Sequence, residues 1–86
     1  MPEISRFFGI VIRMYFSDHL RPHFHARYAE FEARFDIETT SLISGELPPR
    51  ALGLVAEWAS RHRPELRENW RRGRKRVPLI PIAPLE

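Results

Sequence analysis

The chain has 86 residues, 43% of them hydrophobic and 29% charged, with no cysteine and a formal net charge of +3. This length allows one small core, and the composition excludes a disordered or fibrous chain as well as disulfides and thiolate sites. The positive charge is carried almost entirely by arginine, with Lys75 the one lysine. Arginine's planar fork suits phosphate and carboxylate groups, although a GC-rich genome would also favour arginine codons.

The N-terminal residues 1–6 have neither the basic start nor the apolar run of a secretory signal. No apolar run approaches the roughly 18 residues that a membrane-spanning helix needs. We therefore expect a cytoplasmic protein of one domain, residues 1–86, that makes no contact with a membrane.

Residues 8–16 alternate with a period of two, which predicts a β-strand with one buried face. The apolar positions are Phe8, Ile10, Ile12, Met14 and Phe16. Arg13 and Tyr15 would lie on the opposite face. Residues 17–22 then break the alternation, and Pro22 favours a loop there because it lacks an amide donor.

Two short alternating runs follow, at residues 24–28 and 31–35, and they predict a β-hairpin closed by Ala29 and Glu30. The predicted polar partners are His23 with Asp36, His25 with Arg34, and Arg27 with Glu32. A shift by one residue would set apolar against polar side chains throughout, so the register is strongly specified. Ala29 and Glu30 are not the residues that tight hairpin turns prefer, which leaves the turn type open.

The second half of the chain predicts a helix and an extended tail. Residues 42–43 are enough for a short fourth strand, and residues 48–76 then have apolar positions three and four apart, as in a helix packed on a sheet. Pro64 lies inside this pattern, and we expect it to bend the helix rather than end it. Residues 77–86 have proline at every third position, which predicts an extended tail over the domain or over a partner.

Together these elements predict an α+β fold in two layers. A three- to four-stranded antiparallel sheet from the β-rich residues 1–47 would pack on one long C-terminal helix, residues 48–76, bent near Pro64 and followed by the proline-spaced tail, residues 77–86. The other face of the sheet would lie bare. It would carry Arg13, Tyr15, His23, His25, Arg27, Glu32, Arg34 and Asp36.

A resemblance to a known family is carried by residues 4–12, 22–28, 45–48, 51–52 and 68–70. On these segments, and most specifically on Pro-His-Phe-His at 22–25, the chain resembles the small bacterial proteins of the domain-of-unknown-function 4160 family. Such proteins are commonly encoded beside a small protein of the domain-of-unknown-function 2442 family. The resemblance therefore implies a toxin–antitoxin pair with a small, antitoxin-like partner, and it implies no catalytic residues. Ala29, where relatives often have glycine, and Pro64 depart from the family pattern.

The closely spaced histidines first suggest a metal site. His23 and His25 would point to the same side of a strand, and Asp36 or His19 could complete the set of ligands. The arginines on the same face would repel a divalent cation, however. We therefore expect no metal and no other cofactor.

The same face could perform acid–base chemistry on RNA, since histidine titrates near neutrality and arginine can stabilise a phosphorane. The candidate catalytic residues are Tyr15, His23, His25, Arg27, Arg34 and Asp36. In this hypothesis the carboxylate of Asp36 orients His23. The chain would then be a metal-independent ribonuclease, but the sequence leaves open whether it is an enzyme.

Binding of nucleic acid without catalysis needs no acid or base at a scissile phosphate. Arginine, tyrosine and histidine on an open sheet can contact phosphates and stack on bases. The candidate nucleic-acid-binding residues are Arg13, Arg71, Arg72, Arg74, Lys75 and Arg76. Phosphate contacts by the basic run would be strongly salt-dependent. A solvated helix end explains the same run equally well.

The sequence thus favours a component of a toxin–antitoxin system that binds or cleaves RNA through a His/Arg sheet face and is neutralised by a small protein partner. The alternative is a non-catalytic protein-interaction or nucleic-acid-binding module whose histidines are structural. The sequence does not decide the oligomeric state, the surface that the tail covers, or whether His19 joins the histidine face.

Overall fold

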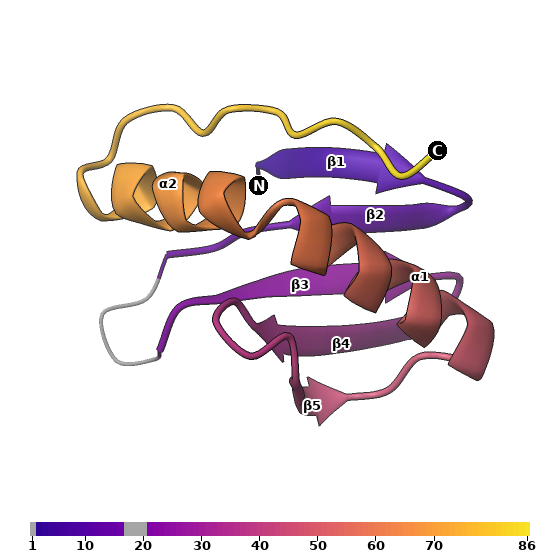
Figure 1. Cartoon of the computed structure of the whole chain (residues 1–86). Coiled ribbons are helices and arrows are strands. Elements are labelled where there is room, and N and C mark those ends of the chain that lie inside the picture. The colour runs from indigo at the N-terminus through magenta and orange to yellow at the C-terminus, as the bar shows by residue number, and fades with distance from the viewer. Residues whose placement is uncertain (1, 17–20) are drawn as a thin grey trace.

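The computed structural model describes residues 2–16 and 21–86, which form a five-stranded antiparallel sheet and two helices (Figure 1). The strands are β1 (Glu3–Phe7), β2 (Ile10–Arg13), β3 (His23–Tyr28), β4 (Phe31–Asp36) and β5 (Leu42–Gly45), in that spatial order. The helices, α1 (Pro49–Arg61) and α2 (Arg63–Arg74), lie against one face of the sheet. No helix of the described ranges is long and apolar enough to cross a membrane.

The first hairpin corrects the prediction of one strand over residues 8–16 and of a three- to four-stranded sheet. A turn at Phe8 and Gly9, with φ angles of 51° and 80°, separates β1 from β2. Phe8 therefore points away from the core and is 56% exposed. The alternation of apolar residues runs straight through this turn, and only Gly9 signals it, since glycine adopts positive φ without strain.

The second hairpin confirms the predicted register. Each residue of β3 faces the predicted partner on β4, from His23 opposite Asp36 to Tyr28 opposite Phe31. The turn has Ala29 at a φ of 53°, a conformation that costs alanine some strain. Burial of the apolar face specifies this hairpin even though the turn residues are unfavourable.

Two helices replace the single long helix that the sequence predicted. The chain leaves helical geometry at His62 (φ −121°, ψ 23°), and Pro64 then lies in the first turn of α2. A proline in a helix interior would lose a hydrogen bond and clash with the preceding turn, whereas in the first turn its missing N–H costs nothing. The break therefore precedes the proline.

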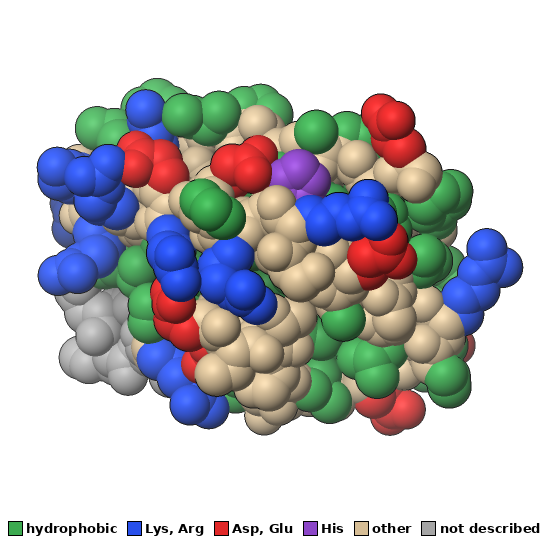
Figure 2. All heavy atoms as spheres, viewed as in Figure 1, with side chains coloured by type: hydrophobic (Ala, Val, Ile, Leu, Met, Phe, Trp, Pro, Cys, Tyr) green, Lys and Arg blue, Asp and Glu red, His purple; other side chains and the backbone are tan. Residues whose placement is uncertain are grey.

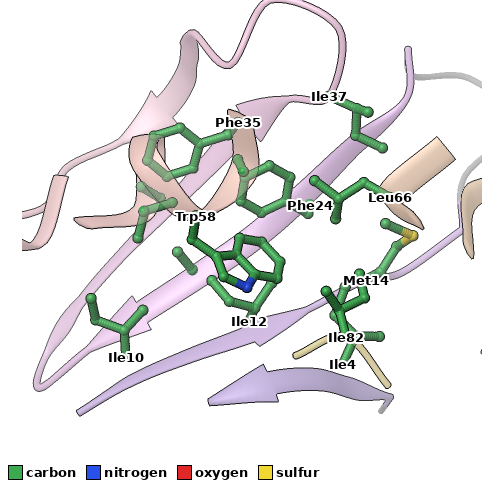
Figure 3. Close-up of a cluster of buried hydrophobic side chains, with 14 of the residues drawn as sticks. Ile4, Ile10, Ile12, Met14, Phe24, Phe35, Ile37, Trp58, Leu66 and Ile82 are labelled. Carbon is green, nitrogen blue, oxygen red and sulfur yellow. The ribbon is translucent and has the colours of Figure 1, made fainter. Parts of the chain in front are cut away.

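The core lies between the helices and the sheet (Figure 3). Trp58 of α1 is fully buried at its centre, where its ring packs against Phe24 and Phe7. Phe24 stacks in turn on Phe35 across the second hairpin, with ring centroids 5.3 Å apart. Because these side chains lie on alternate positions of neighbouring strands, the opposite positions are left to the other face of the sheet.

The loop after β4 is held by two arginines of α2. Arg63 donates hydrogen bonds to the carbonyl oxygen of Ile37 (3.0 Å) and to the hydroxyl of Thr40 (2.5 Å). Arg67 donates to both carboxylate oxygens of Glu38, which lowers the pKa of that carboxyl group. These contacts tie the second helix to the sheet at the end where β3 begins.

The tail packs on its own domain, which settles a question that the sequence left open. The backbone N–H of Ile82 donates to the carbonyl oxygen of Ile4 in β1 (2.7 Å), and the indole N–H of Trp58 donates to the carbonyl oxygen of Ala83 (2.9 Å). The side chain of Asn69 bonds both the N–H and the C=O of Ile80. Figure 1 shows the tail running along α2 and back past β1.

Candidate functional site

The face of the sheet away from the helices carries a row of polar side chains that crosses all five strands. We call it the polar row. In strand order its members are Glu3, Arg13, His25, Arg34 and Ser44, each the cross-strand partner of the next. Adjacent strands lie about 4.8 Å apart, so the arginines on either side of the histidine are roughly 10 Å apart.

His25 is the centre of this row and is the better placed of the two candidate histidines. Its side chain is 18% exposed, and the ring of Tyr15 meets it edge-on, with centroids 4.6 Å apart. Its Nδ1 lies 3.5 Å from a carboxylate oxygen of Glu32, too far for a good hydrogen bond, and it has no other partner among the described residues. An imidazole nitrogen is thus left without a strong partner beside a tyrosine and a carboxylate.

The protonation state of His25 follows from this position. Burial lowers the pKa of the imidazole below its ordinary value, and the neighbouring His23 and Arg34 act in the same direction, while Glu32 opposes them. His25 is therefore neutral at pH 7. A neutral imidazole can accept a proton or a hydrogen bond from a bound molecule.

His23 is buried, which the alternation of residues did not reveal. Only 2% of it is exposed, and its ring lies against Trp70 of α2, with centroids 5.2 Å apart. Its Nδ1 is 2.9 Å from the carbonyl oxygen of Arg21, and since a carbonyl can only accept, Nδ1 carries the proton. A residue held in this way is better suited to structure than to contact with a substrate.

Asp36 lies opposite His23 as predicted, but its carboxylate does not orient the imidazole. One oxygen accepts hydrogen bonds from the backbone N–H groups of Glu38 (2.8 Å) and Thr39 (3.0 Å). The other lies 3.2 Å from Nε of Arg21. Asp36 thus stabilises the turn after β4, because aspartate commonly bonds the backbone two or three residues ahead.

Two further arginines predicted in the site lie on the open face. Arg34 donates to the hydroxyl of Ser44 on β5 (2.9 Å), which holds its guanidinium along the polar row. Arg27 is exposed and donates to the carbonyl oxygen of Ala29 (3.3 Å). The register sets Arg27 opposite Glu32, yet the carboxylate of Glu32 lies nearer His25.

The basic run at the end of α2 is a separate region. Arg71 and Arg72 both pair with Glu68, and Arg72 also reaches the carbonyl oxygen of Pro78. The exposed residues of the run are Arg71, Arg74, Lys75 and Arg76. Figure 2 shows basic side chains gathered at the α2 end of the helix-covered side, so this run and the polar row do not form one flat surface.

A metal centre finds no support among residues 2–16 and 21–86, where no three histidine, aspartate or glutamate side chains gather as ligands. His19, which the sequence left as a candidate member of the face, lies outside the described residues.

Glu32, Ser44 and Trp70 are neighbours of the site outside the candidate catalytic and binding residues. The sequence already placed Glu32 on the polar face of the hairpin, and it lies one diagonal step from His25. Nothing in the sequence signals that Trp70 reaches His23, since the two residues are far apart in the chain.

Comparison with known proteins gives one match. A family model described as "Domain of unknown function (DUF4160)" matches residues 9–71, which run from the β1–β2 turn into α2. The match includes His23, His25 and the rest of the second hairpin, and it leaves out β1 and the tail. No curated protein and no solved structure matches the chain.

Proposed function

We propose that this chain, which belongs to the DUF4160 family, binds single-stranded RNA through the open face of its sheet. The observation that carries the proposal is the polar row, in which His25 lies between Arg13 and Arg34 and against the ring of Tyr15. Arginine binds phosphate through its planar fork, and a tyrosine or histidine ring can stack on a base. An open sheet with these side chains is one of the surfaces by which proteins hold unpaired RNA.

The same geometry favours binding over cleavage. Cleavage of RNA needs a base and an acid at the scissile phosphate, and His23, the second candidate, is buried against Trp70. His25 is neutral and lies between the two arginines, so it is the residue that would act as a base. A ribonuclease would therefore need its acid from Tyr15 or from water.

The biological setting is part of the same proposal. A small RNA-binding protein of this family would act in the cytoplasm, in a toxin–antitoxin system, and a small antitoxin-like protein would neutralise it. This part rests on the family resemblance alone. The alternative, a non-catalytic interaction module, gains support from His23 and Asp36, whose contacts are those of structural residues.

Fluorescence anisotropy with a labelled oligouridine of about twelve nucleotides tests RNA binding. Arg13→Gln and Arg34→Gln should each weaken binding about fivefold, and each should reduce the slope of log affinity against log salt by about 0.7. Arg50→Gln is the matched control, since Arg50 is an exposed arginine on α1. Equal losses for Arg50→Gln, or no binding by the wild-type chain, would contradict the proposal.

Growth on expression of the chain by itself tests the toxin role. Growth arrest that the Arg13→Gln and Arg34→Gln double variant relieves would support it, and normal growth with the wild-type chain would contradict it. Gel analysis of the bound RNA then distinguishes cleavage from binding. Cleavage products that are absent with His25→Ala indicate a ribonuclease, and intact RNA indicates binding only.

A further inference from the structure

A cavity of about 660 Å³ opens at the end of the sheet where β2 leaves it, between that strand end, α2 and the start of the tail. This volume is within the range of pockets that hold small organic groups, roughly 300–1,000 Å³. Most of its lining is apolar, and three of the lining side chains are aromatic. They are Tyr15, Phe16 and Trp70.

The aromatic side chains connect the cavity to the polar row. Tyr15 lines the cavity, and its ring also meets that of His25. Trp70 lines the cavity and contacts both His23 and Phe16. Tyr15 is therefore common to the two regions, and a strand of RNA that lies beside His25 would reach the cavity at this ring.

The polar groups that line the cavity offer an occupant few hydrogen bonds. Asn69 lines it, but its amide is already paired with the N–H and C=O of Ile80. An occupant would be held by the faces of the rings, and Phe16, 37% exposed, offers the most open one. Recognition by stacking tolerates any base, because every base has a π-face.

The segment of chain between two residues of the cavity lining is positively charged. Gly73 and Val77 both line the cavity, and the residues between them include Arg74, Lys75 and Arg76, all exposed. A flat aromatic group in the cavity would thus have cations beside it for an attached phosphate. Aromatic walls, few free polar groups and neighbouring cations together fit a nucleotide better than an uncharged ligand.

We propose that this cavity receives one base of the bound RNA, stacked on Phe16 and Tyr15, while the basic run from Arg74 to Arg76 contacts an adjacent phosphate. This inference rests on the proposed RNA binding and adds the place where a base, rather than the backbone, is held. An apolar side chain of a protein partner is the competing occupant.

Two probes with the same number of phosphates test the inference: the labelled oligouridine and an oligonucleotide of equal length in which every base is absent. The wild-type chain should bind oligouridine about tenfold more tightly than the abasic strand, since stacking contributes only to the first. Phe16→Leu should remove most of this difference and leave the affinity for the abasic strand unchanged. Leucine keeps the apolar contact with Trp70 and removes the ring face.

Phe8→Leu is the matched control, because Phe8 is an exposed phenylalanine at the opposite end of β2. It should change neither affinity. An unchanged preference for bases in Phe16→Leu would overturn the inference and leave the cavity to another occupant, while the losses from Arg13→Gln and Arg34→Gln would still support RNA binding. If the wild-type chain binds neither probe, the proposed function itself fails.

Discussion

The covered and the open face of the sheet are made by the same strands, and their side chains are held in different ways. On the covered face Ile10, Ile12 and Phe24 are fully buried against the helices. On the open face Arg13 and His25 are cross-strand partners and are partly exposed to solvent, and His25 also contacts the ring of Tyr15. Substitutions should therefore change stability on the covered face and binding on the open face.

His23 shows that the two faces are not separated by alternation alone. It shares a side of β3 with His25, yet it is buried because α2 brings Trp70 against it at the end of the sheet. The register of a strand can thus place a residue near its end on the open face, while a helix that packs against that end still buries the residue. The following predictions test this division, beginning with the largest expected effect.

Trp58→Ala should cause the largest loss of stability, about 3–5 kcal/mol, because it empties the centre of the covered face. For a domain of this size such a loss approaches the whole free energy of unfolding. Urea denaturation followed by circular dichroism measures it. Trp58→Phe keeps the ring contacts with Phe24 and loses the bond to Ala83, so its loss should be clearly smaller. Equal losses of stability in the two variants would mean that ring packing is not the main contribution of Trp58 to stability.

Asn69→Ala should cost about 1–3 kcal/mol, since it removes both hydrogen bonds that hold Ile80. The tail should then leave the domain more often, and limited proteolysis should cut residues 77–86 faster. Arg71→Ala, an exposed change two residues away on α2, is the control and should leave the cleavage rate unchanged. A tail that stays protected in Asn69→Ala would show that Ile82 and Leu85 hold it without this bond.

His23→Ala and His25→Ala compare two histidines on the same side of one strand. His23→Ala should lose about 1–3 kcal/mol, because a buried ring and its bond to Arg21 are removed. His25→Ala should lose less than about 1 kcal/mol but should weaken RNA binding several-fold. Urea denaturation and anisotropy on both variants give the result, and a reversed order would remove the distinction between the two positions.

The pH dependence of stability gives the smallest expected effect. The folded-state pKa of His25 is below its ordinary value, so the unfolded chain takes up a proton at this residue more readily than the folded one. The contribution of His25 is therefore fully present above the unfolded pKa, near 6.5, and is lost as the pH falls towards the folded pKa. His25→Gln should flatten this part of the stability curve, measured by urea titration between about pH 7 and pH 5. An identical curve would show that His25 is not desolvated.

The second hairpin was predictable to the residue, and the first was not. In the second, residues 24–28 and 31–35 satisfy only one register, because any slip would place arginine or glutamate in the core. In the first, Phe8 continues the apolar alternation across a turn, so the pattern is that of one longer strand. The helix break was missed for a related reason, since the apolar stripe of α1 continues past His62 into α2.

The sequence predicted which candidate residues share the open face, but it did not predict their contacts. Arg13, Tyr15, His25 and Arg34 lie together on the open face, because a period of two sends them to one side of neighbouring strands. Asp36 lies opposite His23 as predicted, but its carboxylate does not orient the imidazole. The carboxylate instead bonds the backbone of the following turn, a local contact that register does not describe.

The sequence by itself determined the apolar face of the second hairpin, the register of that hairpin and the polar character of the open face, because each follows from periodicity within a short segment. The tertiary structure alone decided that His23 is buried, that the tail packs on β1 and α2, and that a cavity forms beside Tyr15. Each of these depends on residues distant in the chain, such as Trp70 and Asn69, and their positions follow from how the helices dock on the sheet.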